Sequence, residues 1–394
     1  SKIDVANMLT GVTPVANGGT AATTFAAAGL GKRPNAKPII INGDMAVAQR
    51  STSVTGHSAV SYTTVDRFKT VCETGTYTVI QESLTSGAAY LAGFRNALRL
   101  DCTTAQATAG SAGDQTTIEQ RIEGFNLSAF KKGTSSAEKY TLAFWVKANK
   151  TGSNLQVNLR DNTNDRQIGG TYSIASADTW EHKVINFAAD TSGPFADVNT
   201  AELLIEWFLD GGGNYSGGAV PTAWESKANG DRNVTNFDLA GSTNNDWALT
   251  GVQLEVGTFD SNTISSFPFE SFENNLRKCK RYCHILAGTS NIGELTGGFR
   301  SEGSAQCGCQ FPVTMRTTPS TSLLGIRLHN LSTGANLDVS TLSSVNGAGT
   351  NGTWLNMGGF GSGGTTGVVA VIYGYNASPT SGVQSYGIKL DAEL

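Results

Sequence analysis

The chain has 394 residues, a length that suits two or three domains, each able to bury a core of its own. Its 28 basic and 32 acidic side chains leave no basic excess, so we expect no nucleic-acid partner. No apolar run is long enough to cross a bilayer, and Ser1–Asp4 do not begin a signal peptide. We therefore expect no membrane insertion, and assembly in a reducing cytoplasm.

Glycine is the dominant feature of the composition, at 47 residues, whereas charged residues make up only 15%. Glycine, like the many Ser, Thr and Asn residues around it, is a weak helix former that suits tight turns. The composition therefore predicts an all-β protein with short strands.

Residues 1–36 form an N-terminal attachment segment in this interpretation. Thr20 can cap a short helix over Ala21–Ala28, which Gly29 would end. One short helix cannot build a core, so the segment must pack on a neighbouring chain, and we expect an oligomer.

Residues 37–270 are predicted to be one large β-domain with short strands and no long helix between them. Strand spacing of this kind favours a two-sheet jelly-roll sandwich. The clearest candidate strands are Tyr140–Val146, Leu155–Leu159, Trp180–Phe187, Ala201–Leu209 and Trp247–Val256, of which the last is expected to close the sheet. Ala201–Leu209 could be a helix by propensity, but its aromatic and β-branched residues favour a strand.

Residues 271–287 are predicted to form a linking helix. Ser271 can cap it, and apolar residues recur at spacings of three or four from Phe272 to Leu286. Residues 288–394 then form a smaller C-terminal β-sandwich, with candidate strands at Cys307–Val313, Leu323–Leu328, Gly367–Tyr375 and Ser385–Leu390.

Several motifs resemble those of bacteriophage tail fibres and tail-appendage structural proteins. They are Thr13–Thr20 followed by Ala21–Leu30; Ile41-Asn-Gly-Asp-Met-Ala-Val-Ala-Gln-Arg50 with Tyr62-Thr-Thr-Val-Asp-Arg-Phe68; Gly251-Val-Gln-Leu-Glu-Val-Gly257; Phe267-Pro-Phe-Glu-Ser271; Leu276-Arg-Lys-Cys-Lys-Arg-Tyr282; and Phe311-Pro-Val-Thr-Met-Arg316 with Pro319. Ala48 stands where the second motif usually has Trp. The motifs occur in the expected order along the whole chain.

This resemblance implies a carbohydrate-binding-like jelly-roll, then a smaller β-domain, in a homotrimeric fibre of the virion tail. It implies contact with other tail proteins through the N-terminal segment, and non-enzymatic adhesion to host cell-surface polysaccharide. Two alternatives stay open: a head fibre or capsid decoration protein, and a polysaccharide-degrading tailspike.

Aromatic side chains in or beside glycine-rich loops are the candidate ligand-binding residues, because exposed rings can stack on sugars. They are Tyr215, Trp224, Trp354, Tyr373 and Tyr375. Trp145, Trp180, Trp207 and Trp247 lie in predicted strands, where core packing is favoured.

No cofactor or metal is expected. Asp161-Asn-Thr-Asn-Asp165 resembles half a calcium loop but lacks the later glutamate, so a polar turn is favoured. The six cysteines are too sparse for a disulfide scaffold. Cys279, Cys283, Cys307 and Cys309 could supply four thiolates, but their spacing is unusual for zinc, so buried free thiols are favoured.

No catalytic motif is present. Glu202 and Glu206 would share one face of a strand and could in principle act as acid and base. Without a recognisable nucleophile, phosphate loop or zinc motif, the sequence favours a protein that is not an enzyme.

Overall fold

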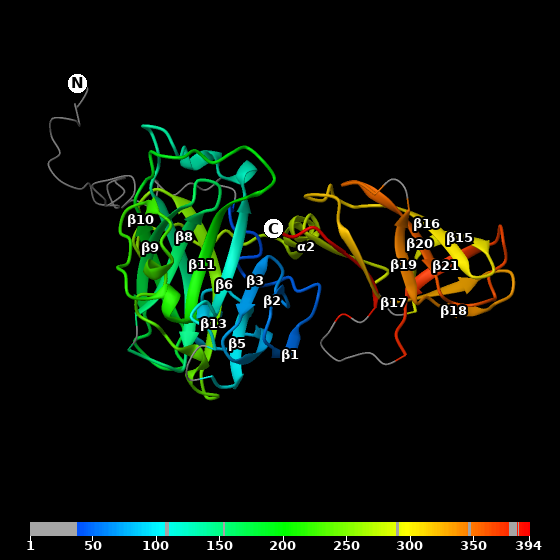
Figure 1. Cartoon of the computed structure of the whole chain (residues 1–394), viewed down its shortest axis with the longest axis horizontal. Coiled ribbons are helices and arrows are strands. Elements are labelled where there is room, and N and C mark those ends of the chain that lie inside the picture. Colours follow the sequence, from blue (N-terminus) through cyan, green and yellow to red (C-terminus); the bar gives the residue numbers. More distant parts are fainter. Residues whose placement is uncertain are drawn as a thin grey trace, which may run out of the picture.

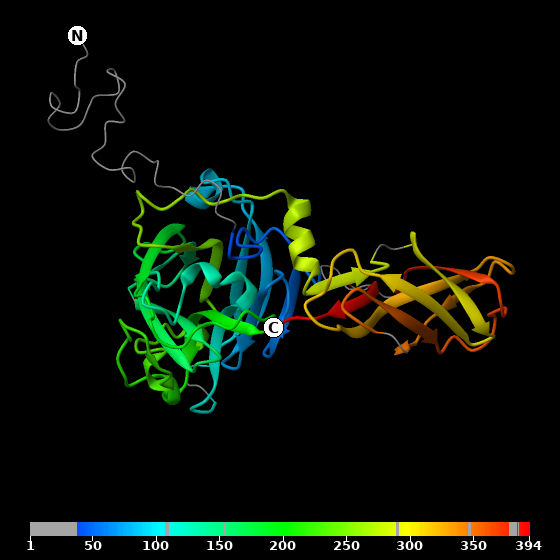
Figure 2. The same ribbon diagram turned by 90° about the horizontal axis from the view of Figure 1, so that it is seen from above.

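The computed structural model describes residues 38–106, 110–152, 154–288, 291–345, 348–377, 384 and 386–394, with the side chains of 154 and 343–345 outside that description. The attachment segment predicted over residues 1–36 lies outside the described residues. Two β-rich lobes lie side by side, with helix α2 (Phe272–Lys280) and the C-terminal end of the chain between them (Figures 1 and 2).

The larger lobe is a jelly-roll sandwich of two antiparallel sheets, as predicted. The first sheet runs β1 (Ser53–His57), β4 (Thr76–Ser83), β5 (Asn96–Thr104), β13 (Asp246–Val256), β7 (Tyr140–Ala148), β10 (Glu181–Phe187). The second runs β12 (Glu225–Ser226), β9 (Arg166–Ser173), β8 (Asn154–Asp161), β11 (Ala201–Gly211), β6 (Gln115–Glu123), β3 (Phe68–Cys72), β2 (Val60–Tyr62). Short helical segments lie in the loops: α1 (Gly87–Leu91), η3 (Gly124–Asn126), η4 (Ser128–Phe130), η5 (Gly213–Tyr215), η6 (Asn229–Asp231) and η7 (Leu239–Gly241).

All five strands expected in this lobe are present, and Ala201–Leu209 is a strand rather than a helix. One expectation is wrong: β13 does not close its sheet but lies between β5 and β7. Its residues are buried along almost the whole strand, as a central position requires.

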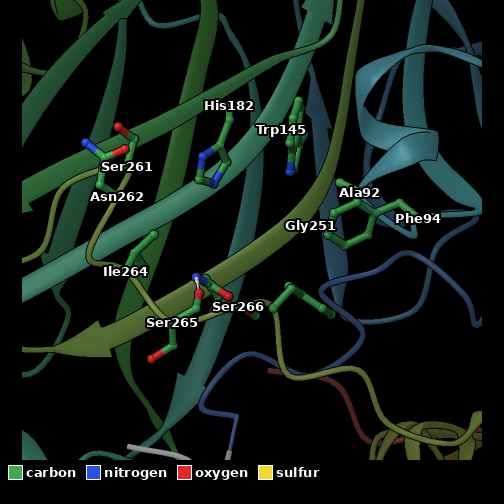
Figure 3. A pocket seen from close by; sticks show the side chains of 12 residues that line it. Ala92, Phe94, Trp145, His182, Gly251, Ser261, Asn262, Ile264, Ser265 and Ser266 are labelled. Carbon is green, nitrogen blue, oxygen red and sulfur yellow. Dashed lines mark hydrogen bonds between the residues drawn. The ribbon is translucent and has the colours of Figure 1, made fainter. Parts of the chain in front are cut away.

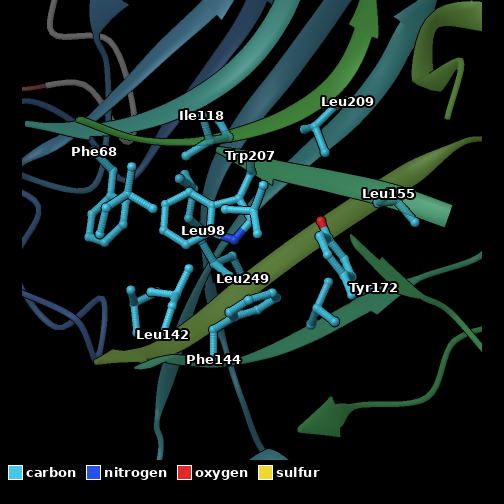
Figure 4. Packing of buried hydrophobic residues seen from close by; sticks show 14 of the residues in the cluster. Phe68, Leu98, Ile118, Leu142, Phe144, Leu155, Tyr172, Trp207, Leu209 and Leu249 are labelled. Atoms are coloured by element: carbon cyan, nitrogen blue, oxygen red, sulfur yellow. The ribbon is translucent and has the colours of Figure 1, made fainter. Parts of the chain in front are cut away.

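The core of the jelly-roll lies between the two sheets and is centred on Trp207, which is fully buried. Its ring packs at 5.8 Å from Phe144 and 6.4 Å from Phe68, measured between ring centroids. Figure 4 shows these rings among aliphatic side chains from both sheets. Alternation in each strand explains the arrangement, because every second side chain points to the opposite sheet.

The smaller lobe is built from one antiparallel path of strands with its own apolar core. The path runs β14 (Cys283–Leu286), β22 (Gly387–Asp391), β17 (Ser320–Asn330), β21 (Val369–Gly374), β15 (Gly293–Ser301), β16 (Ser304–Gln310), β20 (Gly352–Gly358), β19 (Thr341–Val345), with β18 (Asn336–Asp338) on β17. All six cysteines of the chain are buried. Within the described residues no helix is long and apolar enough to cross a bilayer.

The linking helix is shorter than the predicted 271–287. Ser271 does cap it, accepting a hydrogen bond from the backbone N–H of Asn274 at 3.3 Å. The helix ends at Lys280, and Cys283–Leu286 instead pair with β22 as strand β14. Phe272, expected on the apolar stripe, is 59% exposed.

A buried network of charges joins the two lobes. Arg67 is 1% exposed, forms an ion pair with Glu393 near the chain end, and has its guanidinium 3.5 Å from the centre of the Tyr282 ring. Arg50 bridges Glu393, at 3.1 Å, to Asp66, at 3.4 Å. We call these five residues the joint.

Replacing Arg67 with Ala should lower the free energy of unfolding by about 3–5 kcal/mol, because Glu393 would keep a buried charge without its nearest partner. Urea denaturation measures this change. Lys131→Ala is the control, since its pair with Glu138 is exposed and should contribute at most about 1 kcal/mol. Equal effects of the two substitutions would contradict the role assigned to the joint.

His284 of β14 should make stability depend on pH. Burial, followed by the charge of Lys280, lowers the pKa of His284 to about 4, against about 6.5 in the unfolded chain. The unfolded state therefore binds the proton more readily, and stability is lost as the pH falls from 6.5 to about 4. The loss should reach up to about 3 kcal/mol.

The measurement is the difference in unfolding free energy between the wild type and His284→Gln at pH 7 and pH 4. Burial raises the pKa of Asp66 to about 6, which acts in the opposite direction but cancels in this difference. The wild type should lose stability relative to the variant at pH 4. A difference that does not change with pH would show that His284 is not the titrating group.

Candidate functional site

The candidate site is a pocket on the outer face of the first sheet, built around Trp145 (Figure 3). In β7, Leu142, Phe144 and Val146 point into the core, so Trp145 and Lys147 point outward. Trp145 is only partly buried, unlike Trp207 and Trp247 in their strands and Trp180 just before β10. The pocket has a volume of about 300 Å³.

His182 of β10 stands directly opposite Trp145 across the strand pair. The two ring centroids are 5.1 Å apart and the ring planes are tilted by 32°, so the rings form one wall of the pocket (Figure 3). Burial lowers the pKa of His182, which keeps the imidazole neutral near pH 7. The wall is therefore flat, largely apolar and uncharged.

A bulge at Gly251 makes room for the pocket. The pairing of β13 with β7 shifts register between Thr250 and Gln253, and Gly251 lies in the left-handed region with φ +62°. A Cβ atom there would lie 2.6 Å from Cζ of Phe94 and 2.9 Å from Cδ1 of Trp145. Any larger residue would press into both rings, so the glycine is required by space as well as by conformation.

Gln253 supplies an unsatisfied acceptor at the pocket. Its side-chain nitrogen donates to the Ser265 carbonyl at 3.0 Å, whereas Oε1 is buried and has no hydrogen-bond partner in the described structure. The residue is 6% exposed and lines the pocket. A buried acceptor left unpaired costs about 1–3 kcal/mol. Rotation of the Gln253 amide toward the pocket would let a ligand donor remove that cost.

The rest of the described lining is uncharged and mixes polar with apolar side chains. The segment after β13 contributes Ser261, Asn262, Ser265 and Ser266, and apolar walls come from Ala92, Phe94, Ile264 and Phe267. No Asp, Glu, Lys or Arg is among the lining residues. The site thus combines a flat aromatic wall with hydroxyl and amide groups, which suits a neutral, hydroxyl-rich ligand.

Part of the outer face of the second sheet is covered by the chain between β11 and β13. Asn158 donates to the Arg232 carbonyl at 2.9 Å, and Gln156 donates to the Asp231 carbonyl at 2.6 Å. Arg232 pairs with the fully buried Glu206. Gln156, Asn158 and Glu206 of this face are therefore occupied within the protein.

Two of the predicted ligand-binding residues are buried, so the expectation that their rings are exposed is wrong. Tyr215 packs on Phe208 at 5.2 Å and donates to the Gly113 carbonyl at 3.0 Å. Trp224 donates to the Ala188 carbonyl at 2.9 Å and packs against the jelly-roll core. Both loops fold back onto the sandwich. The sequence shows that these residues lie in loops, but it does not show that the loops are packed against the sheets.

The other three lie in the smaller lobe and do not form one site. Trp354 is 53% exposed on β20, whereas Tyr373 lies on β21, separated from β20 by β15 and β16. The Tyr373 hydroxyl donates to Asn336 at 3.1 Å. The Tyr375 ring is covered by the guanidinium of Arg327, 3.2 Å from the ring centre.

The side chains considered as metal ligands either bond to other groups of the protein or lie apart from one another. Asp161 accepts hydrogen bonds from the backbone of Thr163 and Asn164 and pairs with the buried ammonium of Lys132, so this stretch is a polar turn. Cys307 and Cys309 approach to 3.6 Å between sulfurs. Among the described residues, no three His, Cys, Asp or Glu side chains converge as a metal site.

The carboxylates Glu202 and Glu206 do share one face of β11, but both are buried. Glu202 accepts from Thr163 at 2.8 Å, and Glu206 is paired with Arg160 and Arg232. The charges of these arginines hold the pKa of Glu206 below its usual value despite burial. Neither carboxylate is placed to protonate a bound polymer.

Trp145, His182 and Gln253 were not expected as site residues. The alternation of β7 contained the signal, since it places Trp145 on the same face as Lys147 and opposite Phe144. The motif Gly251–Gly257 contained a second signal, because a glycine inside a strand often marks a bulge. Neither of these two signals shows that β7 pairs with β10 and β13, and it is this pairing that brings the three residues together.

Comparison with known proteins gives no assignment. No protein-family model matches the chain, and no curated protein matches it. Among solved structures, the enzymatically active domain of tailspike protein 4 from bacteriophage CBA120 has a TM-score of 0.26 and 13% identity over 56% of this chain, and the match spans 21% of that chain. A putative sugar-binding protein from Bacteroides thetaiotaomicron gives 0.29 and 14% over 56% of this chain and 100% of its own.

The xylan-binding domain CBM22-1 of Paenibacillus barcinonensis Xyn10C gives a TM-score of 0.25 and 10% identity over 57% of this chain and 99% of that domain. At TM-scores this low, these likenesses carry no argument about what the chain binds.

Gly251→Ala should lower the free energy of unfolding more than Gly56→Ala does. Both glycines have similar positive φ, +62° and +68°, but a Cβ at Gly56 meets nothing within 4 Å. The excess should be about 1–3 kcal/mol, the usual cost of overpacking. Urea denaturation of the two variants measures it, and equal losses would show that the rings around Gly251 can move aside.

Proposed function

We propose that this chain is a non-enzymatic, glycan-binding structural protein of a bacteriophage virion, of the tail-fibre or tail-appendage kind. The observation that carries the glycan-binding part is the pocket that the Trp145–His182 wall shares with Gln253, whose Oε1 has no hydrogen-bond partner in the described structure. The ordered motifs along the chain support the virion part.

Sugar recognition needs the two chemistries that this pocket combines. The axial C–H groups of a pyranose form an apolar face that packs on an aromatic ring, and its hydroxyls donate and accept hydrogen bonds. A hydroxyl can donate to Oε1 of Gln253, and Ser261, Asn262 and Ser266 offer further partners. The pocket is small, so we propose that it holds one or two sugar units of a surface polysaccharide.

The same geometry favours binding over cleavage. Retaining and inverting glycosidases both need two carboxyl groups on either side of the bond they cut. The described residues that line the pocket include no carboxylate, and Glu202 and Glu206 lie buried on the other sheet. This supports adhesion rather than a polysaccharide-degrading tailspike.

For the assembly we propose a homotrimer located in the tail, with the N-terminal segment contacting other tail proteins and the β-lobes facing the host surface. The overall affinity for a polysaccharide would then exceed that of each weak single contact, because several sites bind at once. A head fibre or capsid decoration protein is the second candidate. Locating the chain in density of the intact virion distinguishes the two positions.

Trp145→Ala should weaken binding to a neutral glycan at least tenfold, because it removes the stacking surface, and Gln253→Ala should weaken it about tenfold by removing the acceptor. A printed array of neutral and acidic bacterial glycans identifies the probe, and calorimetry with the full chain measures affinity. Val60→Ala, an exposed apolar position on the other sheet, is the control. Unchanged affinity in both pocket variants would contradict the proposed site.

A further inference from the structure

We propose a second saccharide-binding site in the smaller lobe, a stacking platform formed by Trp354 over Gly308, that takes a neutral pyranose sugar. It is independent of the pocket at Trp145 and does not rest on it. Trp354 lies on the outer face of β20, because its neighbours Thr353 and Leu355 are buried in the lobe. Its side chain is 53% exposed.

The indole is held flat by the strand beside it. Gly308 of β16 is the direct partner of Trp354 in the strand pair. A Cβ atom on Gly308 would lie 3.7–3.8 Å from Cη2, Cζ3 and Cζ2 of the ring, which are nearly equidistant from it. The six-membered ring therefore lies face-on against the backbone of β16, which leaves its opposite face open to solvent.

Polar groups surround this open face without any charge. The groove beside Trp354 has a volume of about 650 Å³ and is lined by Gly308, Cys309, Gln310 and residues 349–353. Gln310 lies two residues beyond Gly308 on the same exposed face of β16, and its amide has no hydrogen-bond partner in the described part of the chain. The next outward position along a strand is about 7 Å away, close enough for one sugar to touch both groups.

These features favour a neutral sugar over other ligands. A ring face with one side open binds the apolar C–H face of a pyranose, and the free amide of Gln310 can donate to and accept from hydroxyls. Among the described residues that line the groove there is no Lys or Arg to pair with a phosphate or an acidic sugar, and no carboxylate to hold a cation. The open shape suits an internal unit of a chain rather than a chain end.

Trp145→Ala provides the background in which the platform is tested, because it removes the ring of the jelly-roll pocket. The full chain with this substitution is screened on the printed array of neutral and acidic glycans. We expect it to retain binding to at least one neutral glycan, and addition of Trp354→Ala should weaken that binding at least tenfold. Gly308→Val, which keeps the indole but pushes it off the strand, should weaken binding similarly.

Val369→Ala is the matched control, since Val369 is 48% exposed on the outer face of β21 in the same lobe and should not matter. Far-ultraviolet circular dichroism and the melting temperature confirm that each variant is folded. The proposal is overturned if no neutral glycan binds the Trp145→Ala chain, or if Trp354→Ala in that background changes affinity no more than Val369→Ala does.

The experiments distinguish failure of the platform proposal from failure of the pocket proposal. Loss of all binding on Trp145→Ala would overturn the platform and leave the pocket intact. Full binding after Trp145→Ala and Gln253→Ala, lost on Trp354→Ala, would overturn the pocket and support the platform.

Discussion

Burial of Arg67 is the constraint on which the arrangement of the two lobes depends. Arg67 is only 1% exposed, and burying a charge costs several kcal/mol unless other groups replace the water around it. For Arg67 these groups are Glu393, the Arg121 carbonyl and the face of the Tyr282 ring. These partners come from the end of the chain, from the jelly-roll and from the turn after α2. The charge is compensated only when all three segments meet, so we expect the joint to couple folding of the smaller lobe to that of the larger.

This explains what many of the motif residues do. Gln49 donates to Asp66 at 2.5 Å and to the Cys283 carbonyl at 2.7 Å, and Arg50 reaches Asp66 and Glu393. Arg316 donates to the carbonyls of Ala392 and Glu393, both at 2.7 Å. Residues of the motifs that end at Arg50, Phe68, Tyr282 and Arg316 thus lie in or beside the joint. Gly251 and Gln253 are different, because their motif supplies the bulge and the acceptor of the pocket.

Local patterns predicted the sandwich, since period-two alternation places Leu142, Phe144 and Val146 in the core wherever their strand pairs. They did not predict that the linking helix would stop at Lys280, because Cys283 and Leu286 fit a helical stripe as well as they fit a strand. Pairing with β22, more than 100 residues away, decides that choice. Tyr215 and Trp224 were misplaced for the same reason: loop composition shows that a segment lacks regular structure, not that it is exposed.

The two proposed sites have two structural features in common. In each, a glycine on a neighbouring strand sets the position of a tryptophan: Gly251 leaves room beside Trp145, and Gly308 lets Trp354 lie flat. In each, a glutamine amide near the ring has hydrogen-bonding capacity that the protein does not use. The joint holds the lobes together through buried charges, so we expect the distance between the two rings to vary little. Two weak contacts at a fixed separation select for a ligand that repeats at that spacing, which a polysaccharide does and a single sugar does not.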